Sequence, residues 1–109
     1  MWVRTIKITF ANELMKKSIR SHLSETIDLT ESMILVYRVD LSSNVSLVNH
    51  FFRSKEALES FSEKLKPVRE QLIAMGAKVE VNDGPVWGFK VAGNVTLDML
   101  SNGMDGNPN

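Results

Sequence analysis

The chain has 109 residues, 43% of them hydrophobic, and its 13 basic and 13 acidic side chains give a formal net charge of zero. This length predicts one domain over residues 1–100, followed by a flexible tail rich in Gly and Asn at 101–109. The lack of cysteine excludes disulfides and thiolate metal sites. The balanced charge argues against a nucleic-acid partner.

The N-terminal residues alternate between apolar and polar side chains and do not form the apolar run of a secretory signal. No stretch of the sequence approaches the ~20 apolar residues that a membrane span requires. We therefore expect a soluble, cytoplasmic protein with no membrane partner.

Residues 2–10 predict a strand, because Ile6, Ile8 and Phe10 alternate with polar side chains. Asn12 suits the N-cap of a helix over 13–25, since its side chain can accept a free backbone N–H. At 100° per residue, one half of that helix is largely apolar. Its members include Met15, Ile19, His22 and Leu23.

Residues 33–41 and 45–53 predict a hairpin that admits two registers. With a three-residue loop, one face holds the odd-numbered side chains Leu35, Tyr37, Val39, Leu47, Asn49 and Phe51. A two-residue loop would bring Val48, His50 and Phe52 to that face, because a one-residue slip flips every side chain. The first register collects the more apolar set, so we favour it and expect that face to meet the helices.

A second helix follows, with Ser54 as its N-cap and an apolar stripe along its length. The stripe comprises Leu58, Phe61, Leu65, Val68, Leu72 and Met75. Pro67 predicts a kink or a restart, and Gly76 suits a left-handed C-cap.

Residues 78–81 predict a further strand, 82–85 a turn, and 86–91 a fifth extended segment. Two strand–helix–strand units that flank a hairpin predict the ferredoxin-like α+β arrangement. In it, two helices cover one face of a four-stranded antiparallel sheet.

The opposite sheet face is then expected to carry Val36, Val48 and Phe52 among polar side chains that include Arg38 and His50. Such an apolar patch predicts a homodimer with the two sheets face to face. The segment at 86–91 is a candidate for reaching across to the partner.

The run from Asn49 to Phe61 (NHFFRSKEALESF) resembles the strand-to-helix signature of the dimeric α/β-barrel superfamily, and is most similar to its antibiotic-biosynthesis-monooxygenase-like group. The later run from Leu72 to Val81 resembles the helix-to-strand passage of that group. The resemblance implies a homodimer with a pocket between helices and sheet in each subunit. Members of the group include cofactor-independent oxygenases, isomerases and haem-degrading enzymes.

The resemblance argues against haem degradation. The haem-degrading members have tryptophan where this chain has Phe61, and histidine where it has Gln71. Without that histidine an axial iron ligand is missing. The two histidines of the chain also form no metal-binding motif. We therefore expect neither a metal nor another cofactor.

Three polar side chains, His22, Tyr37 and Asn49, are expected to project into an otherwise apolar helix–sheet layer. A ligand would satisfy their hydrogen-bonding groups, whereas a closed core would pair Tyr37 with Asn49 and His22 with a backbone carbonyl. The remaining candidates for a ligand-binding pocket are apolar or aromatic. They are Met15, Ile19, Phe51, Phe61, Leu65 and Trp87.

The favoured hypothesis is a small-molecule binding protein whose ligand is apolar or amphiphilic, either fatty-acid-like or aromatic. An alternative is a cofactor-independent monooxygenase or isomerase acting on an aromatic or polyketide-like substrate, with His22 as its base. A third is a structural or regulatory homodimer without a ligand. The residues alone do not decide whether the chain is an enzyme.

Overall fold

The computed structural model describes residues 1–26 and 33–101. Its elements are β1 (Trp2–Thr9), α1 (Glu13–Thr26), β2 (Met33–Ser42), β3 (Val45–Phe52), α2 (Lys55–Ala74), β4 (Lys78–Pro85) and α3 (Leu97–Ser101). The predicted tail at 101–109 lies outside the described residues, apart from Ser101 at the end of α3.

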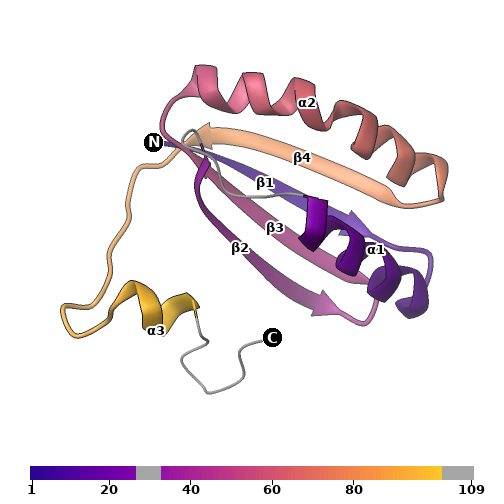
Figure 1. Cartoon of the computed structure of the whole chain (residues 1–109), viewed down its shortest axis with the longest axis horizontal. Helices are drawn as coiled ribbons and strands as arrows, with labels where there is room; N and C mark the ends of the chain where they lie inside the picture. Colours follow the sequence, from indigo (N-terminus) through magenta and orange to yellow (C-terminus); the bar gives the residue numbers. More distant parts are fainter. Residues whose placement is uncertain (27–32, 102–109) are drawn as a thin grey trace.

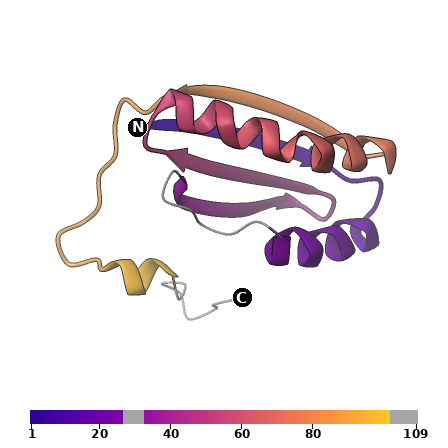
Figure 2. The ribbon, with the colours of Figure 1, turned by 45° about the horizontal axis from the view of Figure 1, so that its top comes forward.

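The four strands form one antiparallel sheet in the order β2-β3-β1-β4 (Figure 1). Ile19 of α1 and Leu72 of α2 share a core cluster with Ile8 and Val48, so both helices cover the same face of the sheet. The predicted ferredoxin-like α+β fold is confirmed. A long connection carries the chain from β4 to α3, which lies apart from the sheet (Figure 2).

Local signals at the helix ends behave as the sequence predicts. The Asn12 Oδ1 accepts the Met15 N–H at 2.8 Å, and the Ser54 Oγ accepts the Ala57 N–H at 3.1 Å. Gly76 has a φ of 97° and donates to the Ile73 carbonyl at 3.0 Å. With the Ala77 N–H bonded to the Leu72 carbonyl at 3.0 Å, this end is a Schellman motif.

Helix α2 continues through Pro67, so the expected restart is wrong. Proline removes the hydrogen bond to the carbonyl four residues earlier, at Glu63. Both Pro67 and Glu63 are exposed, and water can satisfy that carbonyl. Leu58 and Leu72 of the apolar stripe are buried, whereas Met75 at its end is about half exposed.

Strand β4 is longer than predicted, because residues 82–85 continue the ladder with β1 instead of turning. Asp83 lies opposite Arg4, and the two side chains form an ion pair at 2.7 Å. This pairing holds turn-favouring residues in an extended conformation. Residues 86–91 follow β4 without forming the predicted fifth strand, although the Val86 N–H donates to the Met1 carbonyl at 2.9 Å.

The register of the hairpin is the one expected for a three-residue loop, with Tyr37 opposite Asn49 and Leu35 opposite Phe51. The expectation that the face with Tyr37 and Asn49 meets the helices was wrong. Thr5 of β1 lies opposite Asn49, and the side chains of this set point away from the helices. The helices meet the even-numbered set instead: Val36, Arg38, Val48, His50 and Phe52.

Alternation could not identify the correct face because both faces of the hairpin are apolar. The pairing of β1 with β3 decides it, since Ile6 lies opposite Val48 on the helix side. A register shift between Met33 and Leu35 also turns Met33 toward the helices. Met33, Phe52 and Leu58 form a second core cluster there.

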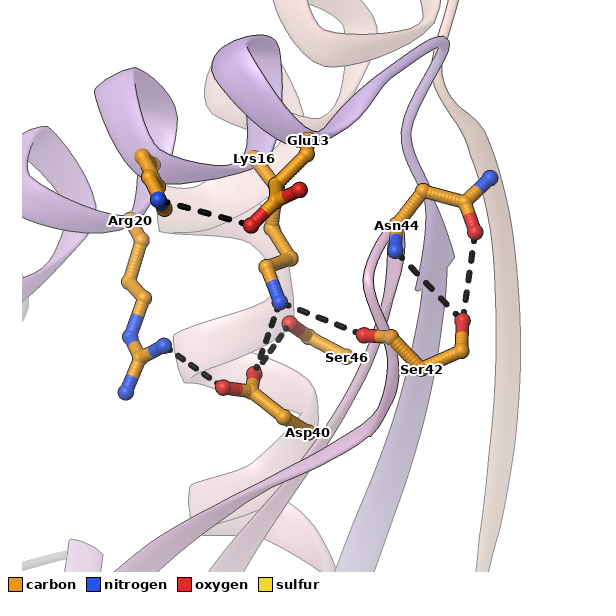
Figure 3. Close-up of polar contacts among 8 residues, drawn as sticks. Glu13, Lys16, Arg20, Asp40, Ser42, Asn44 and Ser46 are labelled. Carbon is orange, nitrogen blue, oxygen red and sulfur yellow. Dashed lines mark hydrogen bonds and ion pairs between the residues drawn. The ribbon is translucent and has the colours of Figure 1, made fainter.

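A polar cluster attaches α1 to the hairpin (Figure 3). The buried Lys16 Nζ lies 3.6 Å from the Asp40 Oδ1 and donates to the Ser42 carbonyl at 3.2 Å. The Arg20 Nη1 contacts the Asp40 Oδ2 at 2.7 Å. Burial acts to raise the pKa of Asp40, but the Ser46 hydrogen bond and the charges of Arg20 and Lys16 outweigh it and lower that pKa.

Replacement of Asp40 should weaken this attachment. We expect Asp40→Ala to lower the free energy of unfolding by about 1–2 kcal/mol at pH 7, because Lys16 stays buried without its carboxylate. Urea denaturation measures the loss. Glu13→Ala is the control, since the pair of Glu13 with Lys17 is exposed and should contribute under about 0.5 kcal/mol.

The contribution of Asp40 also has a pH dependence. Its lowered pKa means that the stabilisation is present at neutral pH and is lost as the pH falls through the folded-state value, below 3.8. The difference between the wild type and Asp40→Ala should therefore shrink in acid. Equal losses for the two variants at pH 7 would contradict the proposed attachment.

Candidate functional site

A cavity of about 70 Å³, partly open to solvent, lies between α2 and the helix-covered face of the sheet and extends to Leu23 of α1. Nine aliphatic side chains, three arginines and one histidine line it. The aliphatic members are Ile6, Ile8, Leu23, Val48, Leu65, Val68, Leu72, Val79 and Val81, and the polar ones are Arg4, Arg38, His50 and Arg69. The cavity is therefore an apolar space with a few polar groups in its wall.

Sheet register sets the positions of the polar groups. Arg4 lies between Asp83 of β4 and His50 of β3, directly opposite each. Arg38 lies opposite Val48, diagonally next to His50 on the same face. Such diagonal positions are within reach of long side chains. His50 is consequently flanked by two guanidinium groups carried on neighbouring strands.

His50 is the central polar residue of the site. Its side chain is 1% exposed and lies edge-on to the ring of Phe61 at 5.9 Å. Neither ring nitrogen has a hydrogen-bond partner within residues 1–26 and 33–101. Burial, followed by the charges of Arg38 and Arg4, lowers the pKa of His50 to about 4. The ring is thus neutral at pH 7, with one donor and one acceptor nitrogen.

Arg4 is a cation with its partners already in place. Its Nε and Nη2 donate to the Asp83 carboxylate at 2.7 and 2.8 Å, and its Nη1 donates to the Ser62 Oγ at 2.6 Å. These bonds join β1 to β4 and α2, and the bidentate geometry balances the charge of the buried guanidinium. Arg4 therefore serves mainly as a fixed part of the cavity wall.

Arg38 and Arg69 are different, because no ion pair involving either is found in the part of the chain that the structure describes. Arg38 is exposed on β2 and Arg69 is half-buried on α2. None of the described lining residues is acidic. The margin of the cavity is consequently positive.

The structure does not bring the predicted polar constellation together. Tyr37 and Asn49 are neighbours across the hairpin, but they lie with Phe51 on the sheet face opposite the helices. There the Thr5 Oγ1 donates to the Asn49 Oδ1 at 3.0 Å, whereas the Asn49 Nδ2 has no partner among the residues described. Their predicted place inside the helix–sheet layer is wrong, because the pairing of β1 with β3 turns the other face of the hairpin toward the helices.

His22 is also misplaced by the sequence interpretation. Helix α1 packs through the row formed by Met15, Ile19 and Leu23. His22 immediately precedes Leu23, about 100° around the helix, and it is exposed. Trp87 is 98% exposed in the segment after β4 and does not line the cavity.

The apolar predictions are closer to the site. Leu65 lines the cavity, Phe61 contacts His50, and Met15 and Ile19 belong to the adjoining core. Whether any of the nine predicted residues binds a ligand stays a prediction.

Sequence reasoning missed the polar groups of the cavity. His50 and Arg38 were placed on the dimer face, and Arg4 was not considered. A signal for Arg4 was available, because it shares the alternation of Ile6 and Ile8. Pairing Ile6 with Val48 would then have moved His50 and Arg38 to the same face.

Two kinds of site were not found among the described residues. These residues contain no cluster of three or more His, Asp or Glu side chains placed to hold a metal ion. None of their helices is both long and apolar enough to cross a membrane.

The chain is similar to several solved structures. No family model and no curated protein sequence matches the chain. A dimeric ferredoxin-like protein from an uncultured marine organism superposes with a TM-score of 0.69 at 14% identity, covering 84% of this chain and 99% of that one. The likeness at this identity concerns the fold.

Two other similar structures have enzyme descriptions. A Deinococcus radiodurans protein, provisionally assigned as an antibiotic biosynthesis monooxygenase, has a TM-score of 0.67 at 10% identity and covers 88% of this chain and 99% of its own. SnoaB, a cofactor-independent oxygenase from Streptomyces nogalater, has a TM-score of 0.63 at 8% identity. The superposition covers 81% of this chain and 95% of SnoaB.

The chain has a ferredoxin-like fold that it shares with these three structures. The predicted resemblance is confirmed at the level of the fold.

Titration of His50 should be visible in the stability of the protein. The unfolded chain takes up a proton near pH 6.5, whereas the folded state resists protonation until about pH 4. The free energy of unfolding should therefore decrease as the pH falls through this window, by up to about 3 kcal/mol from His50.

Chemical denaturation at pH 7 and pH 4 measures the decrease. His50→Phe should remove most of it, because phenylalanine keeps the ring packing and does not titrate. His22→Gln is the matched control and should retain the decrease, since the chain has only these two histidines. An unchanged pH dependence in His50→Phe would show that His50 is not the group responsible.

Proposed function

We propose that the chain binds an apolar or amphiphilic small molecule in the cavity between α2 and the sheet. The observation that carries this proposal is the buried His50 in the cavity wall, neutral and without a hydrogen-bond partner among the described residues. A buried polar group left unpaired costs about 1–3 kcal/mol. A ligand with a polar group would recover that cost, while its apolar part contacts the aliphatic lining.

The size of the cavity limits how such a ligand is held. Its volume of about 70 Å³ is well below the roughly 300–1,000 Å³ of pockets that enclose a drug-sized molecule. The cavity would accordingly take one ring or one end of the ligand. The remainder would extend through the side that is open to solvent.

Binding can be tested by NMR titration with lipid and aromatic compounds, followed through the methyl signals of Val48 and Leu65. We expect a ligand to shift these signals and Val68→Phe to weaken its binding at least tenfold, because the larger side chain fills the cavity. Ile73→Phe is the control on the exposed side of α2. A library that shifts no cavity methyl signal would refute the proposal.

A cofactor-independent oxygenase or isomerase is the second candidate. A neutral imidazole inside an apolar cavity is suited to accept a proton from a bound substrate, and His50 replaces His22 as the proposed base. The fold shared with SnoaB is compatible with it. Once a ligand is identified, an enzyme would convert it, whereas a binding protein would release it unchanged. The turnover of an enzyme should be lost in His50→Phe and retained in His22→Ala.

We also propose a homodimer through the sheet face that the helices leave open. Along β2 and β3 that face carries the exposed apolar side chains of the odd-numbered set, whereas Thr5 and Lys7 of β1 make it polar toward β4. Tyr37 is 48% and Val39 is 40% exposed, around a buried Asn49 whose Nδ2 lacks a partner in the described chain. A second copy would cover these side chains and offer that amide an acceptor. A protein with this fold is described as dimeric.

The segment after β4 has the composition of a dimerisation arm. Trp87 is 98% exposed, and Phe89 and Val91 are about half exposed. The ring of Phe89 lies 6.0 Å from that of Phe51, which places the segment beside the open face. We propose that it reaches across to the partner.

The dimer predicts a specific change in mass. Light scattering coupled to gel filtration should report twice the mass of the chain for the wild type and the mass of one chain for Val39→Lys, because a buried unpaired charge opposes association. Ile73→Lys introduces the same charge on the exposed side of α2 and should stay dimeric. A wild-type protein that is monomeric at all concentrations would rule out the dimer.

A further inference from the structure

We infer that the cavity recognises an aromatic hydroxy acid, with the hydroxyl group toward His50 and the carboxylate against Arg38 and Arg69. The inference rests on the proposed function, since it names the ligand class of the same cavity. Three observations support it: the charge of the margin, the unpaired imidazole, and the size of the space between them.

The charge of the margin favours an anion. Arg38 approaches the cavity from the sheet and Arg69 from α2, and the lining described contains no carboxylate to balance them. Arg4 is not the anchor, because Asp83 already neutralises it through two hydrogen bonds. A carboxylate between Arg38 and Arg69 would form charge-assisted hydrogen bonds, for which the planar guanidinium is well suited.

The two ends of the ligand are assigned by burial. His50 is 1% exposed, and a carboxylate placed beside it among aliphatic side chains would lose its hydration. Arg38 is exposed, so an anion held there remains partly hydrated. A neutral hydroxyl suits the inner position because it can donate to the unprotonated nitrogen of His50.

The cavity also distinguishes an aromatic acid from a fatty acid. A fatty acid held at the arginines would direct only its alkyl chain inward, leaving His50 unpaired. A space of about 70 Å³ is also short for such a chain, whereas one edge of a ring can enter it.

Three single-ring probes test the assignment on the unaltered protein: 4-hydroxybenzoate, benzoate and 4-methylphenol. Each is titrated while the methyl signals of Val48 and Leu65 are followed by NMR. We expect 4-hydroxybenzoate to bind about tenfold more tightly than either probe that lacks one polar group. Raising the salt concentration should weaken the binding of 4-hydroxybenzoate and benzoate and leave the binding of 4-methylphenol unchanged.

Variants then separate the two ends. Arg38→Gln and Arg69→Gln should each lower the affinity for 4-hydroxybenzoate and for benzoate about tenfold. Neither should change the affinity for 4-methylphenol. Lys66→Gln removes an exposed charge from the same helix as Arg69, outside the cavity lining, and should change none of the affinities. His50→Phe should lower the affinity for 4-hydroxybenzoate and 4-methylphenol and leave the affinity for benzoate unchanged.

The outcomes distinguish this inference from the proposed function. If 4-methylphenol binds as tightly as 4-hydroxybenzoate, or if the arginine variants behave like Lys66→Gln, the carboxylate assignment is overturned. If benzoate binds as tightly as 4-hydroxybenzoate, the hydroxyl assignment is overturned. If no probe shifts the cavity methyl signals, the aromatic hydroxy acid is overturned as the ligand class, whereas the binding function fails only if the lipid and aromatic library also shifts none of them. The probe comparisons use the wild type, so they stand even if a variant does not fold.

Discussion

The pairing of β1 with β3 is the constraint on which the rest of the structure depends. Ile6 opposite Val48 and Arg4 opposite His50 decide which side of the hairpin meets the helices. A slip of one residue would exchange every side chain between the two faces. His50 would then point to the open face and Asn49 into the helix layer, and the cavity would lose its imidazole. The site is therefore a consequence of strand register more than of any local motif.

The ion pair between Arg4 and Asp83 has two effects beyond joining β1 to β4. It allows a guanidinium to be 9% exposed inside the helix–sheet layer, because a bidentate carboxylate compensates the lost hydration. It also fixes a positive charge beside His50. Burial is the main cause of the lowered pKa of His50, and the charges of Arg38 and Arg4 add to it. A protonated ring would add a third cation to a space without a nearby carboxylate among its described lining residues.

Features governed by neighbouring residues were predictable from the sequence. The caps at Asn12 and Ser54 and the left-handed Gly76 depend on a few consecutive residues, and they were predicted correctly. The faces of β2 and β3 were not predictable by alternation, since Leu35 and Val36, or Val48 and Phe51, are equally apolar. The strand at 82–85 was missed for a related reason, because the ladder with β1 overrides the turn preference of those residues.

Strand β3 leaves one buried polar side chain unsatisfied on each side of the sheet. His50 lines the cavity and the adjacent Asn49 lies on the open side, and the two His50 ring nitrogens and the Asn49 Nδ2 have no partner in residues 1–26 and 33–101. Consecutive strand residues point in opposite directions, so a single dipeptide serves two separate surfaces. A ligand can satisfy the first and a second chain the second. Both groups lie on one central strand that β1 and β2 flank, so the proposed ligand site and the proposed dimer surface would share that strand.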